Sequence, residues 1–145
     1  MRSTAWLLLA TTGAVCHAEK MIVGIGTDLA EVDRIRDAIE RHGQRFIERV
    51  FTPGEIAYVE RKANRFERYA ARFAAKEAGM KAVGTGWRRG VRWHDFEVKN
   101  LPTGRPTLVI SGAAAQYADA LGARNIVLSL THTAAQAIAV VILES

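Results

Sequence analysis

The stretch Arg65–Val83, RFERYAARFAAKEAGMKAV, decides the fold of this chain, and Gly84 follows it directly. Alanine and long unbranched side chains favour a helix, and a glycine after such a run is typical of a helix end. At helical spacing, one face carries an apolar stripe of Tyr69, Phe73, Met80 and Val83. Another region carries only small side chains, at Ala70, Ala74 and Ala78. The stretch therefore predicts a long helix that packs against the core.

Shorter elements surround this helix. The β-branched run of residues 21–26, MIVGIG, predicts a buried strand that ends at Thr27-Asp28. Four more strands are predicted at residues 95–99, 106–110, 125–131 and 136–143. Helices are predicted at residues 31–42, 53–63 and 112–122, with Thr52 and Glu55 as a capping box before the second. The order indicates one α+β domain, with a mostly antiparallel sheet packed against the long helix.

Composition indicates a globular protein with an acidic partner. The 145 residues are 49% hydrophobic and 24% charged, as in an ordinary soluble domain. The formal net charge of +5 and the pI of 9.8 favour a nucleic acid, a membrane surface, a phosphate ligand or an acidic protein. Cys16 is the only cysteine, which excludes an intrachain disulfide, and it belongs to no CxxC motif or Cys/His cluster of the kind that binds zinc.

Residues 1–20 differ from the rest of the chain. Arg2 precedes the apolar residues 5–10 and a series of small residues before Ala18, which is the outline of a secretory signal and too short for a membrane span. Two interpretations stay open: an export signal, or an N-terminal extension of a reading frame whose true start is Met21. We favour the extension, because Met21 opens a convincing strand. The domain then covers residues 21–145, and we expect it in the cytoplasm.

Two carboxylates predict a magnesium site. Asp28 follows the first strand, where rigid backbone holds it within reach of a ligand, although a helix cap would explain it as well. Glu77 lies four residues before Lys81 in the long helix, so the two share a face and a surface ion pair is the simple alternative. Magnesium is commonly held by one or two carboxylates plus substrate phosphates. Together, these three residues can supply a minimal site for a magnesium-bound pyrophosphate.

Two later segments can contact phosphates. Residues 100–106, NLPTGRP, form a turn whose backbone N–H groups and Arg105 are available to a phosphate or an adenine. His132 ends the strand in residues 128–133, LSLTHT, beside several hydroxyl groups. Most turns and most lone histidines of this kind are structural, and Ser129 with His132 does not by itself make a nucleophile pair.

These segments, in this order and spacing, resemble the holo-acyl-carrier-protein synthase family of small bacterial phosphopantetheinyl transferases. The resemblance rests on GIGTDL, FTPGE, RFAAKEAGMKAVGTG, NLPTGRP and SLTH, and it covers the chain from about Met21 to its end. It implies a small α+β fold that assembles as a homotrimer with active sites between subunits. It also implies transfer of 4′-phosphopantetheine from coenzyme A to a serine of apo acyl carrier protein, giving holo-acyl carrier protein and 3′,5′-ADP. Magnesium is the implied cofactor, and fatty acid biosynthesis the implied process.

The same motifs assign residues to the reaction. Asp28 and Glu77 match the metal carboxylates of the family, while Lys81 and His132 match residues that face the coenzyme A phosphates. The loop beside the nucleotide corresponds to Gly104, Arg105 and Pro106. The proton acceptor stays open among Asp28, Glu77, His132 and a metal-bound water.

A basic stripe of this chain is expected to bind the carrier protein. Arg34 matches the family arginine on the first helix that meets the acidic carrier, and Arg41 and Arg45 follow at helical steps of seven and four. An ordinary solvated face is the alternative, because acidic residues are interspersed at Asp33, Asp37 and Glu40.

Two other functions are weighed against the transferase. A non-catalytic basic module could bind nucleic acid, with Trp87 and Trp93 as a stacking platform among arginines at positions 88, 89 and 92. A magnesium-dependent nucleotide hydrolase is the second. The basic module leaves the carboxylate pair unexplained, so we expect neither a nucleic acid nor a membrane as partner.

Overall fold

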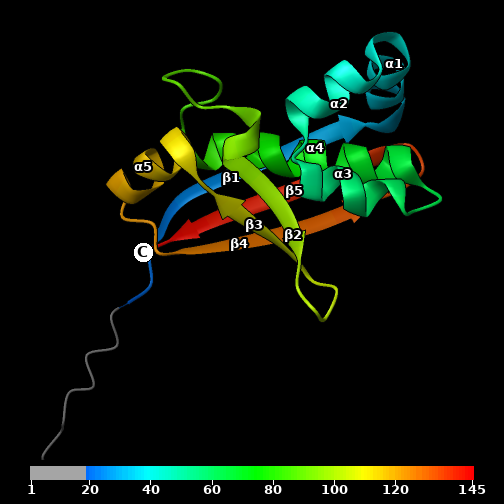
Figure 1. Cartoon of the computed structure of the whole chain (residues 1–145). Coiled ribbons are helices and arrows are strands. Elements are labelled where there is room, and N and C mark those ends of the chain that lie inside the picture. Colours follow the sequence, from blue (N-terminus) through cyan, green and yellow to red (C-terminus); the bar gives the residue numbers. More distant parts are fainter. Residues whose placement is uncertain (1–18) are drawn as a thin grey trace, which may run out of the picture.

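The computed structural model describes residues 19–145 and confirms the predicted α+β architecture (Figure 1). In chain order the elements are β1 (Ile22–Glu31), α1 (Val32–His42), α2 (Gln44–Val50), α3 (Pro53–Glu60), α4 (Arg65–Val83), a 3₁₀ turn (Trp93–Asp95), β2 (Phe96–Asn100), β3 (Pro106–Ile110), α5 (Gly112–Ala120), β4 (Asn125–His132) and β5 (Gln136–Glu144). The predicted N-terminal extension lies outside the described residues, apart from Glu19 and Lys20. Within residues 19–145, no helix combines the length and apolar character needed to cross a membrane.

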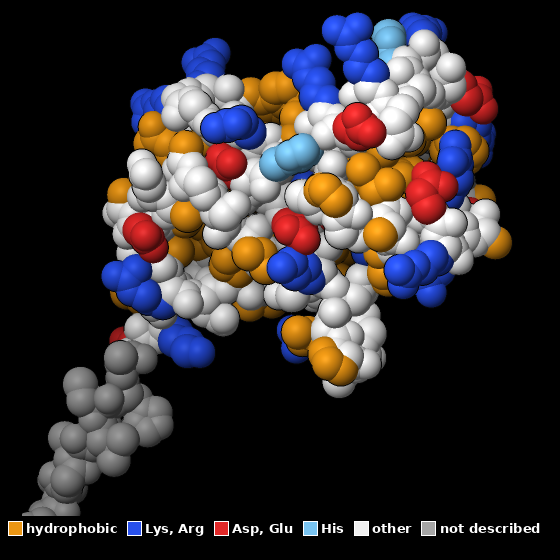
Figure 2. Space-filling model, viewed as in Figure 1, with side chains coloured by type: hydrophobic (Ala, Val, Ile, Leu, Met, Phe, Trp, Pro, Cys, Tyr) orange, Lys and Arg blue, Asp and Glu red, His pale blue; other side chains and the backbone are white. Residues whose placement is uncertain are grey.

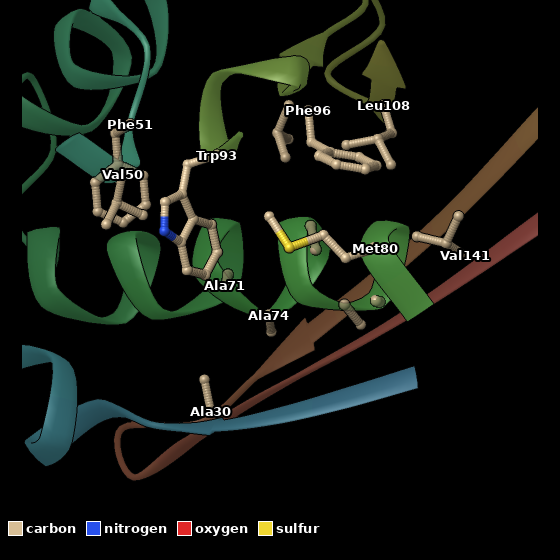
Figure 3. Close-up of a cluster of buried hydrophobic side chains, with 14 of the residues drawn as sticks. Ala30, Val50, Phe51, Ala71, Ala74, Met80, Trp93, Phe96, Leu108 and Val141 are labelled. Carbon is tan, nitrogen blue, oxygen red and sulfur yellow. The ribbon is translucent and has the colours of Figure 1, made fainter. Parts of the chain in front are cut away.

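Helix α4 is the centre of the fold. On one side it packs against an antiparallel sheet with the strand order β1–β5–β4. On the other side lies the β2–β3 hairpin; Figure 3 shows its Phe96 and Leu108 above α4 and Ala30 of β1 below. Of the predicted apolar stripe, Phe73 is only partly buried, and the remainder is in the core. Because α4 is covered on both sides, its alanines are buried as well.

Two glycines let β1 approach α4 closely. A Cβ on Gly24 would lie 2.3 Å from the carbonyl oxygen of Ala82, and a Cβ on Gly26 would lie 1.9 Å from that of Ala78. Both distances are far below van der Waals contact with rigid backbone, so only glycine fits. Side chains alternate along a strand, so Asp28 faces α4 from the same side as Gly26. The helix backbone thereby fixes the position of the Asp28 carboxylate.

The other face of the β1–β5–β4 sheet is left uncovered by the described residues. Ile25 and Leu29 of β1 point away from α4 and are 58% and 49% exposed. Ile138 of β5 pairs with Leu29 and is 41% exposed. Adjacent exposed apolar side chains on one face are typical of a protein interface.

A buried ion pair joins α3, α4 and β2. The side chains of Glu55 and Lys76 are fully buried, with Lys76 Nζ 2.9 Å from Glu55 Oε2. Lys76 also donates to the Phe96 carbonyl oxygen, and Glu55 accepts from the backbone N–H groups of Thr52 and Val98. The predicted capping box is thus confirmed, and its carboxylate has a second role. Buried charges are tolerated where they are paired and hydrogen-bonded, so this pair ties the hairpin to α4.

Two predicted boundaries differ from the structure by three residues or more, and one helix was not predicted. β1 does not end at Thr27-Asp28 but continues to Glu31, because these residues stay in register with β5. Asp28 therefore lies inside a strand and does not follow one. Residues 44–50, for which the sequence pattern predicts no element, form the separate helix α2. Helix α3 ends at Glu60, before the predicted limit at residue 63.

We predict that Gly26→Ala lowers the free energy of unfolding by about 3 kcal/mol or more, because the new Cβ meets helix backbone. Gly122→Ala is the matched control: its φ is +81°, but nothing lies within 4 Å of its Cβ, so the cost should be about 1 kcal/mol. Urea unfolding followed by circular dichroism measures both. Equal unfolding midpoints for Gly26→Ala and the unaltered protein would contradict the close approach of β1 to α4.

Candidate active site

Asp28, Glu77 and Lys81 come together where β1 meets α4. Lys81 Nζ donates to Asp28 Oδ1 at 3.0 Å and to the Thr27 carbonyl oxygen at 2.9 Å. The Asp28 side chain is 15% exposed and that of Lys81 is 53% exposed, so the ammonium still has a free side. Among the described ion pairs, Lys81 therefore pairs with Asp28 of β1 and not with Glu77 of its own helix. The alternative of a plain Glu77–Lys81 surface pair is wrong.

The Glu77 carboxylate lies in a partly buried and negative environment. Burial raises its pKa above the ordinary range, and the nearby charge of Asp28 raises that pKa further. The Trp87 side chain and the charge of Lys81 lower the pKa of Glu77 and so act in the opposite direction. Two neighbouring carboxylates in such a place resist joint ionisation unless a cation lies between them.

Both carboxylates line one cavity of about 330 Å³. Arg34 of α1 lines it too, so the predicted carrier-protein contact lies beside the predicted metal ligands, Asp28 and Glu77. Apolar side chains complete the wall: Ile35, Phe46 and Phe73. Apolar walls reduce the local dielectric constant and strengthen the interactions of the charged groups.

His132 lies in a different cavity, of about 200 Å³. It ends β4, which is separated from β1 by β5, and its Nδ1 is 3.2 Å from Glu67 Oε2. Gly104 and Pro106 of the β2–β3 turn line the same cavity, whereas Arg105 is exposed and does not. A single copy of the chain therefore holds the predicted site residues in two separate parts.

Arg72 is a candidate site residue that sequence reasoning missed. It lines the cavity of His132, is only 4% exposed, and donates to Asn100 Oδ1 at 2.9 Å. Its guanidinium lies 4.1 Å from the centre of the Tyr58 ring, and its Nε has no hydrogen-bond partner among the described residues. A buried donor without a partner is costly, and an anion in the cavity would remove that cost. Arg68 lines the same cavity.

The sequence did contain a signal for these arginines. Arg68, Arg72 and Lys76 recur at steps of four, which places them along one side of α4. The spacing alone could not separate Lys76, which pairs internally with Glu55, from Arg72, which reaches the cavity.

The predicted basic stripe is exposed along α1 and α2. Figure 2 shows Lys and Arg side chains gathered over these helices at the top of the view. Arg45 lines a groove of about 480 Å³ together with Phe46 and Arg49, while Arg41 is exposed on α1. Such a surface is complementary in charge to an acidic partner.

Trp87 and Trp93 do not form an exposed stacking platform. Trp93 is 5% exposed, whereas Trp87 is 54% exposed. The two rings stand edge to face, with their centres 4.4 Å apart, so neither face of Trp93 is open to a base. The nucleic-acid alternative thereby loses the feature on which it depended.

The donor set of Asp28 and Glu77 fits magnesium. Residues 19–145 contain no cluster of three or more His, Cys, Asp or Glu side chains that could hold a metal. Magnesium does not require such a cluster, because it keeps several waters and takes its remaining ligands from substrate phosphates. The charge of Asp28 raises the pKa of Glu77, and a cation bound to both carboxylates would relieve that repulsion.

Comparison with solved structures gives the same fold. The crystal structure of a holo-[acyl-carrier-protein] synthase from Neisseria meningitidis matches with a TM-score of 0.79 and 33% identity, covering 86% of this chain and 100% of that one. A holo-(acyl-carrier-protein) synthase from Bacillus anthracis, solved in complex with CoA (3′,5′-ADP), matches with a TM-score of 0.71 and 39% identity, covering 86% and 98%.

Comparison of sequences gives the family. The model of the 4′-phosphopantetheinyl transferase superfamily matches residues 24–140. A holo-[acyl-carrier-protein] synthase from Solibacter usitatus is 73% identical over 125 residues, which cover 86% of this chain and 100% of that protein. The chain therefore belongs to the holo-acyl-carrier-protein synthase family of the 4′-phosphopantetheinyl transferase superfamily.

Proposed function

We propose that Asp28, Glu77 and Lys81 form the reaction centre of this transferase. As a holo-acyl-carrier-protein synthase, the chain transfers 4′-phosphopantetheine from coenzyme A to a serine of apo acyl carrier protein and releases 3′,5′-ADP. One arrangement supports the assignment of this reaction centre. Two carboxylates and an ammonium from β1 and α4 meet beside one cavity, which Arg34 also lines.

In the proposed mechanism, the serine hydroxyl gives its proton to one of the candidate acceptors of the site. Its oxygen bonds to the β-phosphorus of coenzyme A while the bond from that phosphorus to the leaving 3′,5′-ADP breaks. Asp28 and Glu77 would hold magnesium, which would supply positive charge to the pyrophosphate when bound. Lys81 keeps a half-exposed ammonium beside Asp28, where it can pair with a phosphate oxygen as negative charge develops. The Asp28 carboxylate and the Thr27 carbonyl oxygen keep the ammonium in place before the substrate arrives.

We propose that three copies assemble through the uncovered face of the β1–β5–β4 sheet. Ile25, Leu29 and Ile138 supply adjacent apolar surface on that face. His132 and Arg72 of one copy then complete the site of its neighbour by binding phosphates of coenzyme A, which accounts for the two separate cavities. Cyclic symmetry gives every copy the same pair of half-sites.

The basic stripe of α1 and α2 is the proposed docking surface for acyl carrier protein. Arg34 lies at the reaction cavity, and Arg41 and Arg45 extend the positive surface away from it. Positive charge in this position steers an acidic carrier so that its serine reaches Asp28 and Glu77. We place the reaction in the cytoplasm as a step of fatty acid biosynthesis, with no nucleic acid or membrane as partner.

Incubation of apo acyl carrier protein with this protein, coenzyme A and magnesium should add one prosthetic group, a mass increase of about 340 Da. Mass spectrometry of the intact carrier measures the increase. EDTA should abolish the transfer and excess magnesium should restore it. An unchanged mass with several carrier proteins would contradict the proposed activity. Transfer at an undiminished rate in EDTA would contradict the requirement for magnesium.

Glu77→Gln should lower kcat/KM for transfer by about 10²- to 10³-fold, because one of the two metal carboxylates is lost. The thermal stability of the metal-free variant should not fall, since the change removes a half-buried charge that Asp28 repels. Glu48→Gln, an exposed glutamate of α2, is the matched control and should retain normal transfer. If Glu77→Gln also transfers normally with magnesium, its assignment as a metal ligand is wrong.

Two inactive variants should complement each other if the sites lie between copies. Glu77→Gln and His132→Ala damage different half-sites, so a mixed assembly contains some sites with both native residues. Random mixing in equal amounts should restore about a quarter of the native rate. The rate is measured after co-refolding the two variants, with each variant refolded alone as control. Mixed samples no more active than their components would show that each site lies within one copy.

A further inference from the structure

The side chain of Tyr58, on α3, lies among three cations. Its hydroxyl accepts a hydrogen bond from Arg68 Nη1 at 3.3 Å. The Arg72 guanidinium lies 4.1 Å from the centre of its ring, the Lys62 ammonium 5.4 Å and the Arg68 guanidinium 5.9 Å. A cation over an aromatic ring, within about 6 Å of its centre, is attracted by the negative face of that ring. Tyr58 therefore contacts both arginines that line the cavity of His132, and it lines that cavity itself.

The other partners of these two arginines are neutral as well. Arg68 Nε donates to Asn64 Oδ1 at 2.7 Å, and Arg72 Nη2 donates to Asn100 Oδ1 at 2.9 Å. No ion pair within residues 19–145 includes either arginine. Amides and phenols orient a guanidinium without adding a negative charge to it. The two guanidinium groups are thus held in place while their positive charge stays available to an anion.

A phosphate group suits a cavity built in this way. A guanidinium presents its donors in a rigid fork, and it binds phosphate oxygens in pairs only when that fork is correctly oriented. Arg72 is 4% exposed and its Nε has no partner among the described residues, so one donor is still free. In the proposed function the pyrophosphate of coenzyme A lies at the reaction centre. The phosphate left for this cavity is the 3′-phosphate, which departs with 3′,5′-ADP.

We propose that Tyr58 is a positioning residue for coenzyme A: its hydroxyl holds Arg68 and its ring holds Arg72, so that both guanidinium groups face the 3′-phosphate. This inference rests on the proposed phosphate role of the cavity of His132. Tyr58 does not line the cavity of Asp28 and Glu77, where the proposed chemistry takes place. Its loss therefore weakens binding of coenzyme A and leaves the chemical step intact, which raises KM and spares kcat.

Two variants test the two contacts. Tyr58→Phe removes the hydroxyl and keeps the ring, whereas Tyr58→Leu removes both. Transfer to apo acyl carrier protein is measured at saturating magnesium and varied coenzyme A. We expect KM for coenzyme A to rise about 3- to 10-fold in Tyr58→Phe and about 10- to 100-fold in Tyr58→Leu. The kcat of both should stay within about twofold of the native value.

Dephospho-coenzyme A, which lacks only the 3′-phosphate, separates positioning from a structural effect. Its KM should be the same for Tyr58→Phe and the unaltered protein, because the two arginines then have no phosphate to bind. Tyr117→Phe is the matched control: it removes a hydroxyl that donates to the Arg89 carbonyl oxygen at 3.3 Å, outside this cavity, and should leave both KM values unchanged. A native KM for coenzyme A in Tyr58→Phe overturns the inference. An equal rise in KM for both donors overturns it too.

Failure of this inference is distinguishable from failure of the proposed function. Arg68→Gln tests the cavity itself, and it should raise KM for coenzyme A but not for dephospho-coenzyme A. If Arg68→Gln raises KM and Tyr58→Phe does not, only the role of Tyr58 is wrong. If Arg68→Gln has a native KM for coenzyme A, the phosphate role of the cavity is wrong, and the role of Tyr58 is overturned with it.

Discussion

The proposed reaction centre depends on the contact between β1 and α4. Gly24 and Gly26 have no Cβ, and so the strand backbone lies directly against helix carbonyl oxygens. Asp28 comes next on the same face, and the distance of 3.0 Å between its Oδ1 and Lys81 Nζ follows from that contact. A strand pushed outward by a single methyl group would carry the carboxylate away from α4. The position of one proposed metal carboxylate is thus set by the absence of side chains at Gly24 and Gly26.

Helix α4 serves both parts of the site because adjacent residues point to opposite sides. Glu77 faces β1 and the reaction cavity, while Lys76 is buried on the hairpin side and bonds to Glu55 and to the Phe96 carbonyl oxygen. Arg72, one turn earlier, reaches Asn100 at the end of β2. Breaking a buried pair by removing one partner commonly costs about 3–5 kcal/mol, so the hairpin is held firmly relative to the helix. The same helix therefore orients the proposed metal carboxylate and the proposed phosphate-binding cavity.

Local signals made much of the fold predictable. The alanine-rich stretch, the Thr52–Glu55 capping box and the turn before Pro106 each depend on residues close in sequence, and the structure contains all three elements. The continuation of β1 to Glu31 was missed, because it depends on pairing with β5, more than a hundred residues later. The burial of Lys76 was missed for the same reason, since a lysine in a helix is normally solvated and its partner lies in another helix. The separation of His132 from Glu77 follows from strand order, which no local pattern contains.

The uncovered face of the β1–β5–β4 sheet makes the proposed activity subject to mass action. Where a site exists only between two copies, the number of sites per chain depends on total protein concentration as well as on the amount of substrate. Coenzyme A bound across the contact would favour association, and association would favour binding of coenzyme A, because the two equilibria are linked. The exposed side chains of Ile25, Leu29 and Ile138 would then determine how steeply the activity per chain depends on the total protein concentration.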